Sequence, residues 1–156
     1  MEEQMLKKMS ILLIIFIFLS CHSDKDEVIT KTIIKSSAAP KAIGPYSQAV
    51  KIGDALYCSG QIAIDPKTGE LVNDSIESET EQVLKNLGAV LNDAGMDYSD
   101  VVLATVFMTD IENYGKINSV YAKYFAENPP ARAAVQVVNL PKYVRVEISC
   151  IAVKEN

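Results

Sequence analysis

Two charged side chains lie in segments that otherwise have the composition of buried strands, and they are the best candidates for chemistry. Arg132 is flanked by alanines, whose small side chains would let a ligand come close, and Glu147 lies between Val146 and Ile148. A guanidinium group presents a planar fork of donors that matches a carboxylate. A partly buried glutamate can orient or deprotonate a water molecule. The two residue types therefore suit a site that holds a small carboxylic acid beside a water molecule.

Both residues also have structural interpretations. Arg132 could form an ion pair with Glu147 or with another subunit, and Glu147 could lie on a solvated strand face. Two further features could complete a pocket. Gly60 follows Ser59 near the end of an expected strand, where a glycine lets the backbone approach a ligand closely. Asn118 places an amide on an otherwise apolar helix face.

Composition disfavours several other kinds of site. The chain has 156 residues, a formal net charge of −5, one His and three Cys, and 49% of its residues are hydrophobic. This length fits a single domain. One His disfavours a Ser-His-Asp or Cys-His nucleophile and a zinc site, and there is no C-x-x-C redox pair. The acidic balance argues against nucleic-acid binding, which needs clustered Lys and Arg.

The N-terminal segment has the pattern of an export signal. Two lysines precede nine apolar residues at 11–19, a run too short to span a bilayer but typical of the hydrophobic region of a signal peptide. Ser20 and Cys21 follow and resemble the bacterial lipobox, in which the Cys is acylated. We therefore expect a signal peptide at 1–20, lipidation of Cys21 and a flexible tether at 21–30. The protein would then be a membrane-anchored lipoprotein of the periplasm or cell envelope rather than a cytoplasmic protein. The alternative is an uncleaved N-terminal anchor.

The remaining chain, 31–154, is expected to form one folded domain. Runs rich in apolar residues between Gly or Pro turns predict strands, and helical spacing of apolar residues predicts two helices. The expected strands lie at 32–34, 48–52, 55–62, 101–109, 132–138 and 143–153. The helices are expected to begin at the capping box Ser78-x-x-Glu81 and at Asp110, and to end at Gly95 and Asn128. This order predicts an α+β domain with one sheet and two helices on one of its faces.

The last expected strand has two different faces. Its apolar residues occupy alternate positions, and more polar residues occupy the positions between them. Val144, Val146, Ile148 and Cys150 share one face, and Arg145, Glu147 and Ser149 share the other. Because the helices would cover one face of the sheet, the face with Glu147 must meet water or another subunit.

Six short motifs occur in order along the domain. They are Ala42-Ile43-Gly44-Pro45-Tyr46-Ser47-Gln48-Ala49-Val50, Cys58-Ser59-Gly60-Gln61-Ile62, Asp65-Pro66-Lys67-Thr68-Gly69-Glu70, Thr105-Val106-Phe107-Met108-Thr109-Asp110, Pro130-Ala131-Arg132-Ala133-Ala134-Val135 and Leu140-Pro141-x-x-Val144-x-Val146-Glu147-Ile148. With these motifs the chain resembles the reactive intermediate deaminase family (RidA, also called YjgF) from about Lys31 to Val153. The resemblance implies a chorismate-mutase-like α+β fold, with two helices on one face of a mixed sheet. It also implies a homotrimer whose sheets form a central barrel, with the active sites in clefts between subunits.

The resemblance also implies an activity. Family members hydrolyse reactive enamines and imines, such as 2-aminoacrylate and 2-iminobutyrate, to 2-keto acids and ammonia, and they use no metal or organic cofactor. Arg132 corresponds to the arginine that binds the substrate carboxylate, and Glu147 to the glutamate that positions or activates water. The other pocket positions correspond to Tyr46, Ser59, Gly60 and Asn118.

The sequence departs from the family at one pocket position and leaves other functions open. Ala134 stands where many active members have a cysteine, so we expect a change in pocket shape or in sensitivity to oxidation. Cys58 and Cys150 are expected to be buried thiols, and whether they form a disulfide stays open. A non-catalytic module that binds small carboxylates in the cell envelope is the alternative function. RNA cleavage, attributed to some family members, is disfavoured by the acidic charge.

Overall fold

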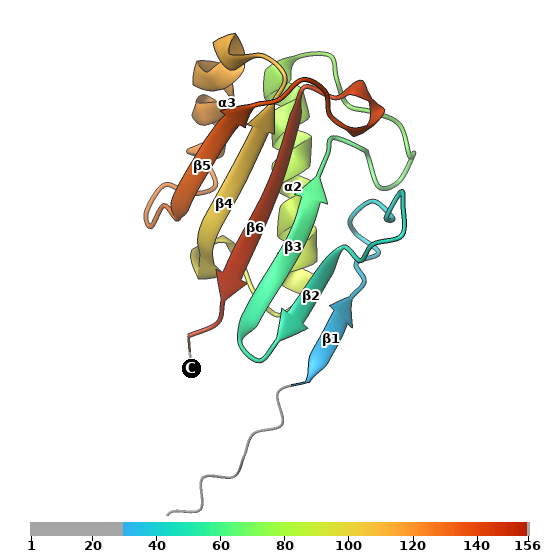
Figure 1. Cartoon of the computed structure of the whole chain (residues 1–156), viewed down its shortest axis with the longest axis vertical. Coiled ribbons are helices and arrows are strands. Elements are labelled where there is room, and N and C mark those ends of the chain that lie inside the picture. The colour runs from blue at the N-terminus through green and yellow to red at the C-terminus, as the bar shows by residue number, and fades with distance from the viewer. Residues whose placement is uncertain (1–29, 156) are drawn as a thin grey trace, which may run out of the picture.

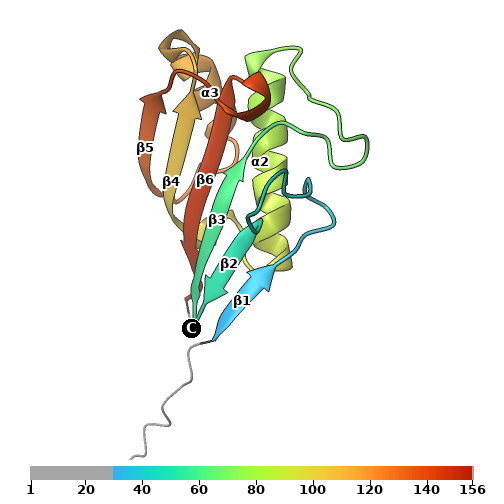
Figure 2. The same cartoon turned by 45° about the vertical axis from the view of Figure 1, so that its right-hand side comes forward.

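The computed structural model of the chain describes residues 30–155 (Figure 1). Six strands in this region form one sheet in the order β1-β2-β3-β6-β4-β5, in which only β4 and β5 run parallel. The strands are β1 (Lys31–Ile34), β2 (Ala49–Ile52), β3 (Ala55–Gln61), β4 (Val101–Met108), β5 (Ala131–Gln136) and β6 (Val146–Val153). The helices α2 (Ile76–Asp93) and α3 (Tyr114–Tyr121) lie on the same face of the sheet (Figures 1 and 2). The predicted α+β fold is therefore confirmed.

The core forms between α2 and the central strands. Val83, Leu84 and Leu87 recur at helical spacing and are fully buried, so this apolar stripe of α2 packs against the sheet. The predicted N-terminal capping box is wrong by three residues. Ser75 is the N-cap, and its side chain and that of Ser78 each accept a hydrogen bond from the other's backbone N–H at 3.0 Å. A serine at the third helical position thus takes the place that Glu or Gln usually has in this motif.

Two other predicted boundaries also differ from the structure. Helix α3 ends at Tyr121, well before Asn128, because the chain continues in tight turns with bonds such as Tyr124 N–H to Tyr121 O at 3.1 Å. These turns still bury Phe125, whose ring stacks on Tyr121 with centroids 4.4 Å apart. Strand β6 begins at Val146 rather than at residue 143, since 141–143 form a 3-10 turn.

The alternation predicted for the last strand is confirmed from Val146 to Cys150, whereas Val144 and Arg145 precede β6 and the Arg145 side chain bonds Glu79 of α2 instead. Val146, Ile148 and Cys150 are buried on the face that the helices cover, whereas Glu147 and Ser149 are half-buried on the opposite face. Within residues 30–155 no secondary structure covers that opposite face, which we call the open face.

The open face carries an apolar row that runs across the sheet. Ile33, Val50, Tyr57, Ile151 and Leu103 are successive partners on neighbouring strands and so project from one face. Ile33, Tyr57 and Leu103 are 42%, 48% and 37% exposed. Contiguous apolar exposure of this kind is typical of a protein–protein interface.

Cys58 and Cys150 lie directly opposite each other on β3 and β6, and both are buried free thiols as expected. The predicted signal peptide (1–20), the lipidation site Cys21 and residues 21–29 of the predicted tether lie outside the described residues. Within 30–155, no helix is both long enough and apolar enough to cross a bilayer.

Candidate active site

A cleft of about 280 Å³ opens where β3 ends and β6 begins. It is lined by Ile43, Tyr46, Ser59, Gly60, Ile62, Pro141 and Glu147. Four of the predicted site residues, Tyr46, Ser59, Gly60 and Glu147, therefore share one cavity, which we call the glutamate half-site. A cavity with mostly apolar walls and a few polar groups is the usual form of a small-molecule site.

Glu147 supplies the ionisable group of this half-site. Its side chain projects from the open face and is half-buried, and burial raises the pKa of its carboxyl group. No hydrogen-bond donor or cation contacts this carboxylate within the part of the chain that the structure describes. An unpaired carboxylate with a raised pKa is a stronger base than an ordinary glutamate and suits proton transfer with water.

Gly60 allows Glu147 to occupy this place. A Cβ atom on residue 60 would lie 2.6 Å from Cδ and 2.8 Å from Cγ of Glu147, and it would overlap Oε1. The register between β3 and β6 shifts between Cys58 and Gln61, as in a β-bulge. At this irregularity the Gly60 backbone lies against the Glu147 carboxylate, so a residue larger than glycine at position 60 would displace the carboxylate.

Ser59 and Tyr46 are fixed by local hydrogen bonds. The Ser59 hydroxyl donates to Ser47 O at 2.7 Å, and its backbone N–H donates to Gln48 O at 3.0 Å. The Tyr46 hydroxyl accepts from Ile43 N–H at 3.3 Å, which closes the Gly-Pro-Tyr turn over the cleft. These bonds hold the wall of the half-site in place without using the carboxylate.

Arg132 belongs to a second group of residues, around α3. Its Nη2 donates to the Tyr114 hydroxyl at 3.1 Å, and its guanidinium carbon lies 4.7 Å from the ring centroid of Tyr121. The Asn118 amide and the Arg132 guanidinium lower the pKa of the Tyr114 phenol. Arg132, Tyr114, Asn118 and Tyr121 form what we call the arginine half-site.

The sequence did not identify the two tyrosines as site residues. Tyr114 and Tyr121 recur at helical spacing along the second expected helix, a pattern that favours a place in the core over a role in binding, and Tyr121 is buried. Tyr114 is 41% exposed, and it lies on the same side of α3 as Asn118, four residues on. The spacing of four residues between the Tyr114 hydroxyl and the Asn118 amide is the sequence pattern that could have identified Tyr114 as a site residue.

The two half-sites of one chain lie on opposite faces of the sheet. Arg132 is the register partner of Ala104, which in turn pairs with the buried Cys150 on the helix-covered face. Glu147 instead pairs with Phe107 on the open face. Residues paired across strands project from the same face, so Arg132 and Glu147 cannot meet within one chain. The possible intrachain ion pair between them is therefore excluded.

Similarity to known proteins identifies the family. The family model described as Endoribonuclease L-PSP matches residues 36–154. A rat protein named 2-iminobutanoate/2-iminopropanoate deaminase is 49% identical over 81% of this chain and 92% of its own length. A RutC family protein of Pyrococcus horikoshii is 52% identical over 80% of this chain and 99% of its own length. The chain belongs to this L-PSP/RidA family.

Solved structures place the fold in the RidA family as well. A Thermotoga maritima protein matches with a TM-score of 0.80 and 50% identity, over 81% of this chain and all of that chain. Escherichia coli TdcF with bound serine matches with a TM-score of 0.77 and 40% identity, over 80% of this chain and 99% of its own. RidA from an Antarctic Psychrobacter gives 0.76 and 42%, over 79% and 99%.

The RidA relatives overturn the predicted localisation. They are named as deaminases and not as lipoproteins, and the Arabidopsis thaliana relative, 44% identical over 80% of this chain and 66% of its own length, is a chloroplastic protein. The prediction of an exported, membrane-anchored lipoprotein is therefore wrong. A short apolar run before a Cys is a weak signal, because any nine apolar residues with flanking lysines reproduce it.

Proposed function

We propose that this protein hydrolyses reactive 2-imine and 2-enamine acids, such as 2-iminobutyrate and 2-aminoacrylate, to 2-keto acids and ammonia. The observation that carries the proposal is the unpaired, half-buried carboxylate of Glu147 held over Gly60 in an open cleft. The names of the rat and human relatives support this reaction. The serine in the TdcF structure supports a ligand with an amino acid's carboxylate.

The chemistry needs a base and a carboxylate anchor but no covalent nucleophile. The carbon of a protonated imine is already electrophilic, so water can add to it while Glu147 accepts a proton from that water. The protonated Glu147 returns its proton to the nitrogen of the resulting carbinolamine, which expels ammonia and releases its hydroxyl proton to water, so the C=O group of the 2-keto acid remains. An enamine must first take a proton on its terminal carbon to become the imine. Arg132 would hold the carboxylate and orient the C=N carbon toward the water.

We further propose that the complete site forms between chains of a homotrimer. Arg132 and Glu147 project from opposite faces of one sheet, so a site that contains both requires two copies. A cyclic trimer in which each copy contributes different surfaces to its two neighbours repeats this contact three times. The apolar row on the open face supports burial of that face against other copies.

The activity is tested with enzymatically generated 2-iminobutyrate in the presence of semicarbazide. Wild-type protein should lower semicarbazone formation, and Glu147→Gln and Arg132→Ala should each lose about 10²–10⁴ in rate. Lys85→Ala is a matched charge control, because this lysine is exposed on α2 and makes one i, i+4 pair with Glu81. An unchanged decay of the imine with wild-type protein would refute the proposal. Calorimetric binding of 2-ketobutyrate without faster decay would point to the non-catalytic binding module.

The shared site has a sharper test in mixed trimers. Arg132→Ala and Glu147→Gln chains should each be nearly inactive alone, but co-refolding them in equal amounts should restore about a quarter of the sites, because a random trimer places an intact Arg132 next to an intact Glu147 with that frequency. If both residues acted within one chain, the mixture would stay inactive. Sedimentation velocity on the same samples reports whether trimers have formed.

A further inference from the structure

Glu79 is the one charged residue between 30 and 155 that is fully buried, with an exposed fraction of 0%. It lies in the first turn of α2, outside both half-sites. A buried carboxylate is retained at a cost unless its oxygens are paired, so its partners show what it holds.

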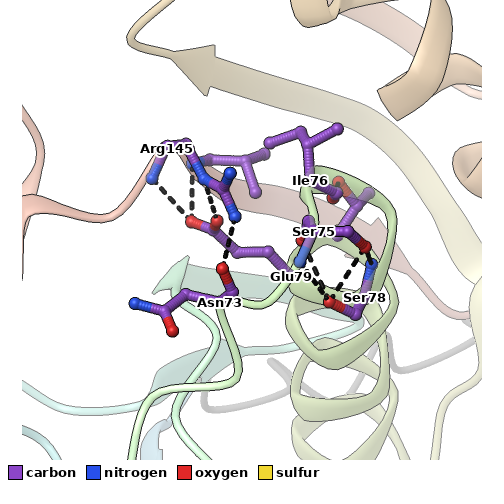
Figure 3. Close-up of polar contacts among 8 residues, drawn as sticks. Asn73, Ser75, Ile76, Ser78, Glu79 and Arg145 are labelled. Atoms are coloured by element: carbon purple, nitrogen blue, oxygen red, sulfur yellow. Dashed lines mark hydrogen bonds and ion pairs between the residues drawn. The ribbon is translucent and has the colours of Figure 1, made fainter.

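The partners of Glu79 are Val146, the first residue of β6, and Arg145, the residue just before it. Oε1 accepts the backbone N–H groups of Arg145 at 2.6 Å and of Val146 at 3.3 Å, and Oε2 accepts Nε of Arg145 at 2.7 Å. The Arg145 Nη2 atom also donates to Asn73 O at 2.8 Å, just before α2 (Figure 3). The side chain of Glu79 therefore fixes two consecutive peptide groups, and Glu147 is the next residue of the strand.

The segment before this contact is strained. Lys142 and Tyr143 both have φ of +56°, a left-handed conformation that non-glycine residues adopt only when their surroundings impose it. Pro141, at the start of the same turn, lines the cleft with Glu147. Val144, the residue after this turn, is buried in a small apolar cluster with Ile62 and Ile64. Pro141 and Glu147, which both line the cleft, thus lie before and after the peptide groups of residues 145 and 146 that Glu79 binds.

We propose that Glu79 is a positioning residue of the active site, whose buried carboxylate fixes the backbone at 145–146 and thereby sets the place of the Glu147 carboxylate. This inference rests on the proposed function, because it assigns the role of Glu79 in that same site. Glu79 touches no substrate and acts only through the strand that it holds. Arg145 is the auxiliary partner, which adds one bond to Glu79 and one to Asn73.

Glu79→Gln in the full-length chain tests the proposal. The amide oxygen can still accept the two backbone N–H groups, but its NH₂ group faces the Arg145 Nε–H, so the contact loosens. We expect kcat for 2-iminobutyrate to fall about 10- to 100-fold, as for a misplacement of about 1 Å, whereas KM changes little because Arg132 binds the carboxylate elsewhere. Melting curves define a temperature at which all variants are folded, and kinetics are measured there.

A second readout needs no activity. The pKa of Glu147 is measured by ¹³C NMR titration of labelled glutamate carboxyls, with Glu147→Gln identifying the resonance. Because burial raises this pKa, a loosened strand that admits water should move it down toward the ordinary glutamate value, and the acid limb of the kcat profile should move with it. If wild type proves inactive, the proposed function fails, and this titration still decides the role of Glu79.

Two variants complete the comparison. Lys154→Gln removes the ion pair to Asp100 Oδ2 (3.1 Å) at the other end of β6, and it should leave kcat and the pKa of Glu147 unchanged. If Glu79→Gln does not fold, Arg145→Ala keeps Glu79 on the backbone N–H groups and should produce smaller shifts in the same directions. A lower melting temperature with wild-type kcat and an unshifted pKa of Glu147 would mean a structural role only and would overturn the proposal.

Discussion

Replacing Gly60 with alanine should lower the catalytic rate while the protein stays folded. The added methyl group would lie 2.6 Å from Cδ and 2.8 Å from Cγ of Glu147. The obstructing atoms belong to a half-buried side chain with open cleft beside it, so the carboxylate can retreat and the backbone can stay. We therefore expect a folded protein with a displaced Glu147 carboxylate.

The size of the effect follows from these distances. Non-bonded carbon atoms rest about 3.6 Å apart, so the carboxyl carbon must retreat by about 1 Å. A misplacement of about 1 Å in a catalytic group costs about 10²-fold in rate, or about 2.7 kcal/mol in activation free energy. Stability should change little, because alanine restricts the unfolded chain more than glycine does and this gain offsets part of the displacement.

The imine-trapping assay and thermal melts of Gly60→Ala measure the two effects separately. Gly115→Ala is the matched control, since a Cβ atom there meets nothing within 4 Å, and it should keep wild-type kcat/KM. In a Glu147→Gln background, Gly60→Ala should cost almost nothing further, because the carboxylate that it displaces is already gone. Wild-type activity of Gly60→Ala, or losses that multiply in the double variant, would refute the reasoning.

Three further outcomes follow from the site and the core. Tyr114→Phe removes the hydroxyl that accepts from Arg132 at 3.1 Å and should raise KM about 3- to 10-fold with little change in kcat, as steady-state kinetics would show. Because the pKa of Glu147 is raised in the folded state, its protonated form stabilises the fold at low pH, and this contribution is lost as pH rises through the folded-state pKa. Glu147→Gln should therefore melt higher than wild type at pH 7, and the difference should vanish below about pH 4. The hydrogen bond with Cys58 and burial raise the pKa of Cys150, so iodoacetamide at pH 8 should modify this thiol in denatured but not in native protein, as peptide mass mapping would show.

The sequence was sufficient wherever side-chain periodicity was strong. The period-two pattern of β6 predicted that Glu147 lies opposite the buried Ile148, and the helical spacing of α2 predicted its buried stripe. These patterns arise because one face of each element is buried against the same core. They therefore determine the orientation of Glu147 but not its partners.

The face of Arg132 could not be predicted in this way. The alanines around it pack equally well in apolar and in half-exposed surroundings, so β5 has no alternation that would orient its side chains. The parallel register between β5 and β4 shows which face Arg132 occupies, since Arg132 pairs there with the buried Ala104. The partner of Glu79 was hidden for a related reason, because Arg145 lies 66 residues further along the chain.

The separation of the two charges across the sheet has a chemical consequence. If Arg132 shared the cleft of its own chain with Glu147, the guanidinium would pair with the carboxylate, lower its pKa and weaken it as a base. On opposite faces the two groups cannot neutralise each other, and burial alone acts on Glu147 and raises its pKa. In the proposed trimer, the arginine of a neighbouring copy would be occupied by the substrate carboxylate, so the base keeps its strength while the substrate is bound. In the proposed mechanism, the sheet therefore separates Glu147, the base, from Arg132, the carboxylate anchor, within each chain, and the two groups come together only when chains assemble and substrate binds.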